Sequence, residues 1–214
     1  MNNRLLEIYH ALYRHFGPQH WWPGDSPLEV MVGAVLTQNT NWQNVSRAIA
    51  NLKAAGLLSL TALTALPVEV LAARIRPAGY YNLKAGRLKN LLALLNEKYQ
   101  GQLADFLEEE TAVLRALLLS SKGIGPETAD SILLYAARRP VFVVDAYTHR
   151  FLLRHGLISE EDDYHEIQDL FVGALPEDAA LFNEYHALIV RLGKDFCKKR
   201  QPLCASCPLE WLSR

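Results

Sequence analysis

The feature that most constrains the fold of this chain is a two-glycine turn, Gly123-Ile124-Gly125, between two segments with helical spacing of apolar residues. The apolar residues are Val113, Leu114, Leu117 and Leu118 before the turn, and Ala129, Ile132, Leu133 and Ala136 after it. Glycine permits a tight hairpin and lets backbone N–H groups approach another molecule without an intervening side chain. The amides that begin a helix are suited to binding an anion such as phosphate. The pattern therefore predicts two helices joined by a phosphate-binding hairpin.

A carboxylate, Asp145, follows an apolar run at Val141–Val144, twenty residues beyond Gly125. Four residues are too few to establish a strand, and we interpret the run as a buried connector. An Asp in such a position is often a helix cap. A phosphate-binding turn followed by a poised acid nevertheless favours an enzyme that acts on nucleic acid.

The composition is that of an ordinary globular protein, with 214 residues, 50% of them hydrophobic and 21% charged. This length allows one large domain or two small lobes around a substantial core. No apolar stretch reaches the ~18 residues that span a bilayer, and the N-terminus lacks a signal-peptide pattern. We therefore expect a cytoplasmic monomer that does not associate with a membrane. Its binding to DNA would place it at the nucleoid.

The formal net charge of −1 provides no general attraction to DNA, so any affinity depends on local groups of cations. Two such groups stand out: Arg74, Arg76, Lys84, Arg87 and Lys89 form the first, and Lys194, Lys198, Lys199 and Arg200 form the second. The first group is as well explained by a solvated face as by DNA binding.

Apolar periodicity predicts helices almost throughout, and hence an all-α fold. Ser26 is placed to cap a helix that begins at Pro27, and residues 76–79 are predicted to form a loop. Further helices are predicted around residues 5–13, 45–52, 67–71, 88–99, 164–175 and 179–192.

The hairpin and the acid together resemble the helix-hairpin-helix (HhH-GPD) DNA glycosylases of the endonuclease III superfamily. In that family the hairpin reads Gly-hydrophobe-Gly, and the catalytic Asp lies in a Val-Asp-x-x-x-x-Arg context, as Val144, Asp145 and Arg150 do here. The resemblance extends from about Trp21 to Cys207, and it implies that Asp145 is the catalytic residue.

The resemblance also implies two helical lobes. One is a central bundle of residues 27–137, and the other combines residues 1–26 with residues 138–214. Double-stranded DNA with a damaged base would lie in the cleft between the lobes, with Asp145 at its floor. Lys122, Gly123, Ile124 and Gly125 would contact the DNA, and the second basic group would run beside its backbone.

The residue two positions after Gly125 bears on the type of glycosylase. Members that also cut the DNA strand carry a lysine there, which forms a Schiff base with the sugar. This chain has Glu127, and a carboxylate cannot form an imine. The departure favours a monofunctional enzyme in which Asp145 stabilises the oxocarbenium ion and directs a water molecule. A simple helix-capping role for Glu127 is compatible with this.

Two further segments, residues 21–42 and 76–85, resemble the 3-methyladenine DNA glycosylases of the endonuclease III type. By position, Trp22, Pro23, Trp42 and Glu127 would line the base pocket. Indole rings stack on a flipped base and favour its positive charge, by roughly 1–2 kcal/mol per contact. Adjacent tryptophans are otherwise explained by core packing. Known members of this type without a metal cluster carry a modified lysine in the last helix, where this chain has Leu188, so the substrate range need not be the same.

Gln38 and Asn39 fall where the superfamily places a polar residue that fills the gap left by the flipped base. An amide can both donate to and accept from the orphaned partner base. The sequence does not distinguish the two residues, and residues 37–40 also fit an ordinary turn.

Three cysteines near the C-terminus, Cys197, Cys204 and Cys207, match the first three positions of the family motif Cys-x6-Cys-x2-Cys-x5-Cys, which binds a [4Fe–4S] cluster. The fourth position is Ser213, whose oxygen is a poor iron ligand. Three interpretations of the motif remain: a cluster with an atypical fourth ligand, a labile three-cysteine cluster, or a loop without metal. A bound cluster would hold the basic loop, Lys198 to Gln201, in place.

The leading hypothesis is a monofunctional glycosylase of base excision repair that releases alkylated purines of the 3-methyladenine type after base flipping. An endonuclease III-like glycosylase for pyrimidine lesions, with or without AP-lyase activity, is the alternative enzyme. A non-catalytic lesion-binding protein is the alternative from another class, and Asp145 argues against it.

Overall fold

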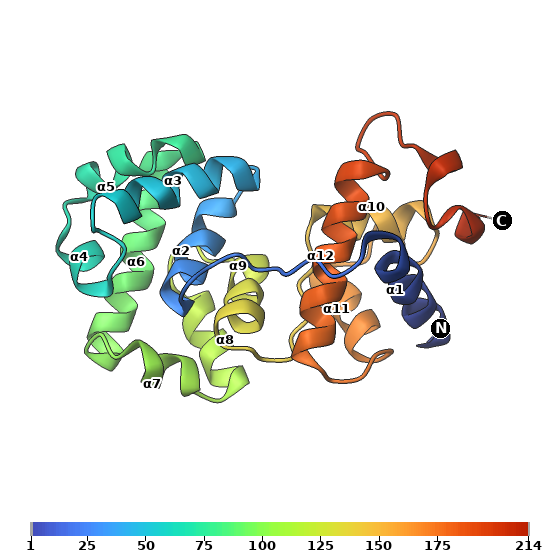
Figure 1. The fold of residues 1–214 in the computed structure, drawn as a ribbon. Helices are drawn as coiled ribbons and strands as arrows, with labels where there is room; N and C mark the ends of the chain where they lie inside the picture. Colours follow the sequence, from blue (N-terminus) through green and yellow to red (C-terminus); the bar gives the residue numbers. More distant parts are fainter. Residues whose placement is uncertain (1, 214) are drawn as a thin grey trace. The chain divides into compact units, whose positions relative to one another are not determined.

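The computed structural model describes residues 2–213, and the side chains of residues 4–212. Every regular element in this part of the chain is helical, with no β-strand among them (Figure 1). The predicted all-α class is therefore confirmed.

The chain divides into two compact units. We call Pro23–Arg139 the hairpin unit, and Met1–Trp22 together with Pro140–Arg214 the terminal unit. The hairpin unit contains α2 (Pro27–Thr37), α3 (Trp42–Ala54), α4 (Leu60–Ala65), α5 (Val68–Arg74), a 3-10 turn (Arg76–Ala78), α6 (Tyr81–Tyr99), α7 (Leu103–Glu108), α8 (Thr111–Ser120), α9 (Pro126–Ser131) and a π-helical turn (Ile132–Ala136). The terminal unit contains α1 (Asn2–Phe16), α10 (Ala146–Arg154), α11 (Tyr164–Val172), α12 (Ala179–Asp195) and two 3-10 turns (Cys204–Ser206 and Glu210–Ser213).

The core of the hairpin unit is built around α2, in which every residue from Leu28 to Leu36 is buried. Helices α3 and α6 and the π-helical turn all pack against it, so α2 is buried on all sides and is apolar there except at Glu29. Ser26 accepts a hydrogen bond from the Glu29 amide at 3.2 Å, which confirms the predicted N-cap.

The first basic group is a solvated face only in part: Arg74 and Arg76 are exposed, whereas the two lysines are held by backbone carbonyls. Lys84 is buried, and its ammonium donates to the carbonyls of Leu36 at 2.8 Å and Ala78 at 2.7 Å. Lys89 donates to the carbonyl oxygens of Leu63 and Thr64 at 2.7 Å and 2.8 Å. Burial, followed by the nearby charge of Arg87, lowers the pKa of Lys84 to about 8. These cations hold the unit together, a role that periodicity in the sequence does not reveal.

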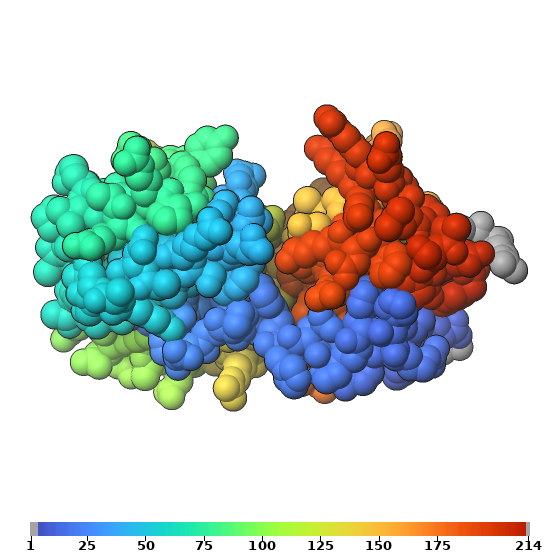
Figure 2. Space-filling view, turned by 45° about the horizontal axis from the view of Figure 1, so that its top comes forward, coloured from blue at the N-terminus to red at the C-terminus, as the bar shows by residue number. Residues whose placement is uncertain are grey.

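In the terminal unit, α12 packs against α1 and α10, and Figure 2 shows the blue N-terminal and red C-terminal segments side by side. The Tyr185 hydroxyl donates to the Leu5 carbonyl at 2.8 Å, which joins α12 to α1. The predicted connector is confirmed, because residues 142–144 are buried and have no regular secondary structure. Phe142 fixes it in the core by stacking on Phe171, with ring centroids 3.7 Å apart.

The other differences from the sequence prediction are local. The expected loop at residues 76–79 contains a 3-10 turn, Arg76–Ala78. Helices α4 and α7 were not predicted, since six residues each are too few to display a helical period.

Candidate active site and DNA-contact elements

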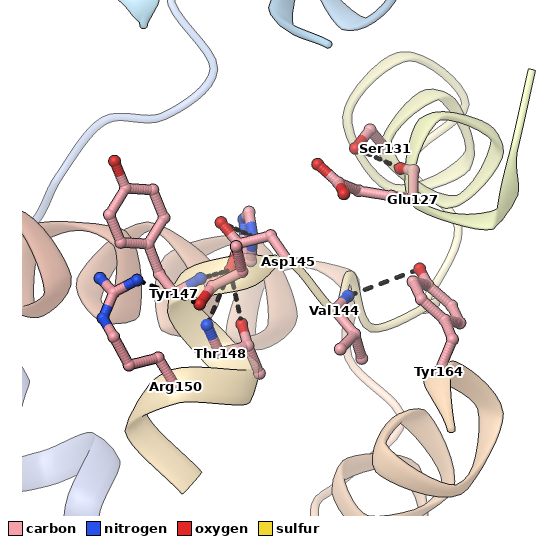
Figure 3. Close-up of polar contacts among 10 residues, drawn as sticks. Glu127, Ser131, Val144, Asp145, Tyr147, Thr148, Arg150 and Tyr164 are labelled. Atoms are coloured by element: carbon pink, nitrogen blue, oxygen red, sulfur yellow. Dashed lines mark hydrogen bonds and ion pairs between the residues drawn. The ribbon is translucent and has the colours of Figure 1, made fainter. Parts of the chain in front are cut away.

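Asp145 is the N-cap residue of α10, directly after the buried connector. Its Oδ1 accepts hydrogen bonds from the amides of Tyr147 at 2.9 Å and Thr148 at 2.8 Å, and from the Thr148 hydroxyl at 3.0 Å (Figure 3). Its Oδ2 lies 3.5 Å from Nε2 of His186 on α12. The predicted helix cap is therefore confirmed at Oδ1, and Oδ2 takes no part in it.

The surroundings of Asp145 favour its ionised form. Burial raises the pKa of this carboxyl, but His186 and the Thr148 donors outweigh burial and hold the pKa below its usual value. Charge on a buried carboxylate is what stabilisation of a cationic transition state requires.

Sequence reasoning missed His186, which lies 41 positions beyond Asp145 and is joined to it only by the packing of α10 on α12. No local motif marks such a partner. The one available signal was a histidine in an otherwise apolar stretch of a predicted core helix, which is more often a packed residue than a functional one.

The hairpin has the form that the sequence predicts. Gly123 has a φ of 97°, and a side chain there would collide with Arg87, so only glycine fits. Ile124 is buried and anchors the tip, and the Lys122 carbonyl accepts from Asn90 of α6 at 2.8 Å. Gly125 is exposed and has no atom within 4 Å of where a Cβ would stand. The fold itself therefore does not require glycine at this position, which leaves room for a ligand to approach the backbone.

The two helices of the hairpin are joined by an ion pair between a partly exposed arginine and a buried aspartate. Arg115 of α8 donates from Nε to Oδ1 of Asp130 at 2.7 Å and from Nη2 to Oδ2 at 3.1 Å. The Asp130 side chain is completely buried. A bidentate pair of this kind fixes orientation as well as distance, so it sets the geometry in which α9 follows the hairpin.

Gln38 and Asn39 are the central residues of a tight turn after α2. The Thr40 amide donates to the Thr37 carbonyl at 3.1 Å, Gln38 has φ −51° and ψ 118°, and Asn39 has φ 53°. These angles define a type II turn, whose third residue must be glycine or asparagine. The ordinary-turn interpretation is therefore correct as far as the backbone is concerned.

The side chains of these two residues differ. Gln38 donates to the Gly123 carbonyl at 3.1 Å and to the Thr128 hydroxyl at 2.9 Å, and it accepts from Arg87. Its amide is therefore engaged in holding the turn to the hairpin. Asn39 is exposed, and its side chain makes no hydrogen bond within the described residues.

Tyr80, like Asn39, is an exposed residue in a turn, and sequence reasoning missed it. Its side chain is 71% exposed, and φ is positive at both Gly79 (68°) and Tyr80 (44°). A positive φ is unusual for an aromatic residue. Lys84 bonds the carbonyls of Leu36 and Ala78, which lie two residues before Gln38 and Tyr80, so one ammonium supports both turns.

The residues predicted to line a base pocket belong to both units. Trp22 is in the terminal unit with Asp145, whereas Pro23, Trp42 and Glu127 are in the hairpin unit. Trp22 and Trp42 are half-buried, and Pro23 and Glu127 are exposed. The rings of Trp21 and Trp22 lie with centroids 5.0 Å apart, so part of the indole surface in this segment is used in packing.

The three cysteines line one cavity of about 60 Å³ in the terminal unit, together with Arg154 and His155. Arg154 donates to Cys197 Sγ at 3.3 Å and to the Lys198 carbonyl at 2.7 Å. Cysteine thiolates are the ligands that iron–sulfur clusters take, so the residue types suit a cluster. In the part of the chain with described side chains, no group of His, Cys, Asp or Glu is arranged to hold a metal ion. The Ser213 side chain lies outside that part.

The second basic group is exposed at Lys194 and at residues 198–200. Arg154 bonds the carbonyls of Lys198 and Lys199, at 2.7 Å and 3.1 Å. The loop backbone is therefore tied to α10 while its cationic side chains remain available to solvent.

A glycine hairpin between two helices joined by an ion pair, followed by an ionised Asp at a half-buried helix cap, in an all-α fold, defines a helix-hairpin-helix DNA glycosylase. The chain belongs to the HhH-GPD superfamily of base excision DNA repair proteins, whose sequence profile matches residues 32–177.

Relatives cover nearly the whole chain. A candidate DNA repair glycosylase of Methanocaldococcus jannaschii is 49% identical over 208 residues, 96% of this chain and 94% of that protein. Endonuclease III of Thermotoga maritima is 31% identical over 206 residues, 96% of this chain and 90% of its own. The structure of H. pylori 3-methyladenine DNA glycosylase bound to 1,N6-ethenoadenine matches with a TM-score of 0.78 at 34% identity, covering 89% of this chain and 97% of that one.

None of the described helices has the length and apolar character that crossing a membrane would need.

Proposed function

We propose that this DNA glycosylase is monofunctional and hydrolyses the N-glycosidic bond of alkylated purines of the 3-methyladenine type, as a monomer on damaged double-stranded DNA. The observation that carries the proposal is Glu127. It is exposed in the first turn of α9, at the position where the lyases of the family present their amine, and a carboxylate cannot attack the sugar to form an imine. The similarity to the H. pylori 3-methyladenine glycosylase supports the choice of substrate.

The proposed chemistry needs one ionised carboxylate and water. An N3-alkylated purine carries positive charge, so when the bond between C1′ and the base breaks, its electron pair leaves with a neutral base. The sugar becomes an oxocarbenium ion, which the charge of Asp145 stabilises. Water adds its oxygen to C1′ and releases one proton, for which Asp145 Oδ2 is the proposed first acceptor.

For recognition of the base, we assign stacking to Trp22 and Trp42, with Pro23 beside them. A cationic purine gains roughly 1–2 kcal/mol from each well-placed indole face. Glu127 would add selectivity for the positive charge. A neutral pyrimidine lesion gains less from such a set of groups.

For DNA binding, we assign the backbone phosphate contact to residues 122–125, where the amides of Gly123 and Gly125 donate to no group within the described residues. Between the two wedge candidates we favour Asn39, because removing Gln38 from its position would break the three hydrogen bonds that hold it. The exposed ring of Tyr80 is suited to stacking on a neighbouring base, an interaction worth about 1–3 kcal/mol.

Replacing either of the exposed turn residues, Asn39 or Tyr80, should slow base release from duplex DNA. Asn39→Gly keeps the type II turn, since glycine also suits its third position, and removes only the amide.

Tyr80→Ala should weaken binding to a duplex with an abasic site by roughly 5–150-fold, the equivalent of about 1–3 kcal/mol of lost stacking. Single-turnover release and fluorescence anisotropy measure the two effects.

The assignment of the wedge has its own control. Gln38→Ala removes the network to the hairpin and should lower the thermal midpoint, whereas Asn39→Gly should leave it close to the wild type. If Asn39→Gly releases base from duplex DNA at the wild-type rate, Asn39 is not the wedge.

For the cofactor, we propose that Cys197, Cys204 and Cys207 hold an iron–sulfur cluster with a structural role, fixing the loop from Lys198 to Gln201. The Arg154 guanidinium would balance thiolate charge at Cys197. No step of the base-release chemistry passes through the cluster.

Protein purified without oxygen should contain iron and acid-labile sulfide, with broad visible absorption. Cys204→Ala should lose both and become more susceptible to proteolysis in the loop. Wild-type protein that contains neither iron nor sulfide would rule the cluster out.

The function is tested by base release from methylated duplex DNA, with and without a final alkali step. Free 3-methyladenine, with strand breaks only after alkali, is the expected result. Breaks without alkali would show that another amine supplies lyase chemistry. Release of oxidised pyrimidines alone would favour the endonuclease III-like alternative, which the 31% identity to the Thermotoga maritima enzyme supports. Binding without any release would leave a lesion-binding protein.

A further inference from the structure

The two oxygens of Asp145 have different tasks in the structure. Oδ1 is saturated, because it accepts from two amides and one hydroxyl of α10. A carboxylate oxygen offers about two lone pairs, so Oδ1 has no capacity left for a water molecule. Any chemistry at this residue must use Oδ2, and Oδ2 faces the His186 ring at 3.5 Å.

The position of the His186 ring is fixed by its surroundings. The residue is 6% exposed, and its ring meets Phe142 edge to face, with centroids 6.5 Å apart and planes at 89°. The imidazole therefore cannot leave the carboxylate without disturbing the core.

We propose that His186 is a positioning residue for base release, which keeps Oδ2 of Asp145 ionised and directed during the reaction. The inference rests on the proposed function in assuming that Asp145 performs hydrolysis. At 3.5 Å the contact is at the outer limit of a hydrogen bond, and the His186 ring lowers the pKa of Asp145 first as a hydrogen-bond partner and then through charge. Without the ring, the desolvated carboxylate would take up a proton more readily.

The other polar groups around the pair do not replace the imidazole. From α10, Arg150 donates to the carbonyls of Cys197 and Gly193, and its guanidinium lies 5.0 Å from the Tyr147 ring centroid. Burial, and then the charge of Asp145, raises the pKa of Tyr147, which therefore stays protonated at neutral pH. From α11, the Tyr164 hydroxyl accepts from the Val144 amide at 3.4 Å. His186 is thus the side chain whose removal should change the ionisation of Asp145.

The test compares His186→Phe, which keeps an aromatic ring beside Phe142, and His186→Gln, which keeps an N–H donor without the charge. The matched control is Tyr185→Phe, which removes one buried hydroxyl from the same helix turn. Single-turnover release is measured from pH 5 to pH 8. We expect the ratio of the rates at pH 5 and pH 8 to fall roughly tenfold below the wild-type ratio in both His186 variants and to be unchanged in Tyr185→Phe.

A second measurement does not depend on turnover. The 13C resonance of the Asp145 carboxyl, identified by its loss in Asp145→Asn, should titrate at higher pH in His186→Phe than in the wild type. An unchanged titration midpoint, with parallel pH–rate profiles, would overturn the inference. A wild-type protein that releases no base would instead contradict the proposed function, while the titration still decides the role of His186.

Discussion

Asp145→Asn is expected to lower the single-turnover rate of base release by about 10²–10⁴-fold. The amide cannot balance the charge of an oxocarbenium ion or accept a proton from water. It does retain an oxygen for the Tyr147 and Thr148 amides, and asparagine is as good an N-cap as aspartate. The fold and the affinity for duplex DNA should therefore be preserved.

The measurement pairs release kinetics with two controls. The thermal midpoint checks that α10 is still capped, and anisotropy with an abasic-site duplex checks that DNA is still bound. A variant that folds, binds and releases base within tenfold of the wild-type rate would remove Asp145 from the reaction.

The largest expected effect on stability comes from the ion pair that clamps the hairpin helices. Arg115→Met leaves Asp130 buried without its cation, and removing one partner of a buried pair costs about 3–5 kcal/mol. For a chain of this length the thermal midpoint should fall by roughly 6–20 °C. DNA affinity should fall as well, since α8 and α9 hold residues 122–125 in place.

The matched control replaces both partners. Arg115→Met combined with Asp130→Leu leaves no unpaired charge, and the midpoint should recover most of the loss. Differential scanning calorimetry distinguishes the variants. A midpoint for Arg115→Met that equals the wild-type value would show that the pair contributes nothing to the clamp.

Features that depend on neighbouring positions were predictable from the sequence. The hairpin glycines, the Ser26 cap and the buried connector before Asp145 each have a local signature, and each is confirmed. The different surroundings of the two Asp145 oxygens were not predictable, because the sequence does not show that Oδ1 caps α10 while Oδ2 faces His186.

Features that depend on tertiary packing were not predictable. Lys84 lies in a basic group that also suits a solvated face, and only the approach of two carbonyls shows that it is buried. His186 meets Asp145 through the contact of two helices. The exposure of Tyr80 follows from two consecutive residues with positive φ, a conformation that the pair Gly79-Tyr80 permits without requiring.

The hydrogen bonds of the Lys84 ammonium limit where residues can be inserted into this chain. It projects from the first turn of α6 and reaches the bases of two separate turns. One residue inserted between Tyr81 and Lys84 would rotate the side chain by roughly 100° about the helix axis and release both turns together. The same insertion after Tyr99, beyond the end of α6, would leave Lys84 beside its two carbonyl partners. Insertions should therefore be tolerated after α6 and excluded at its start.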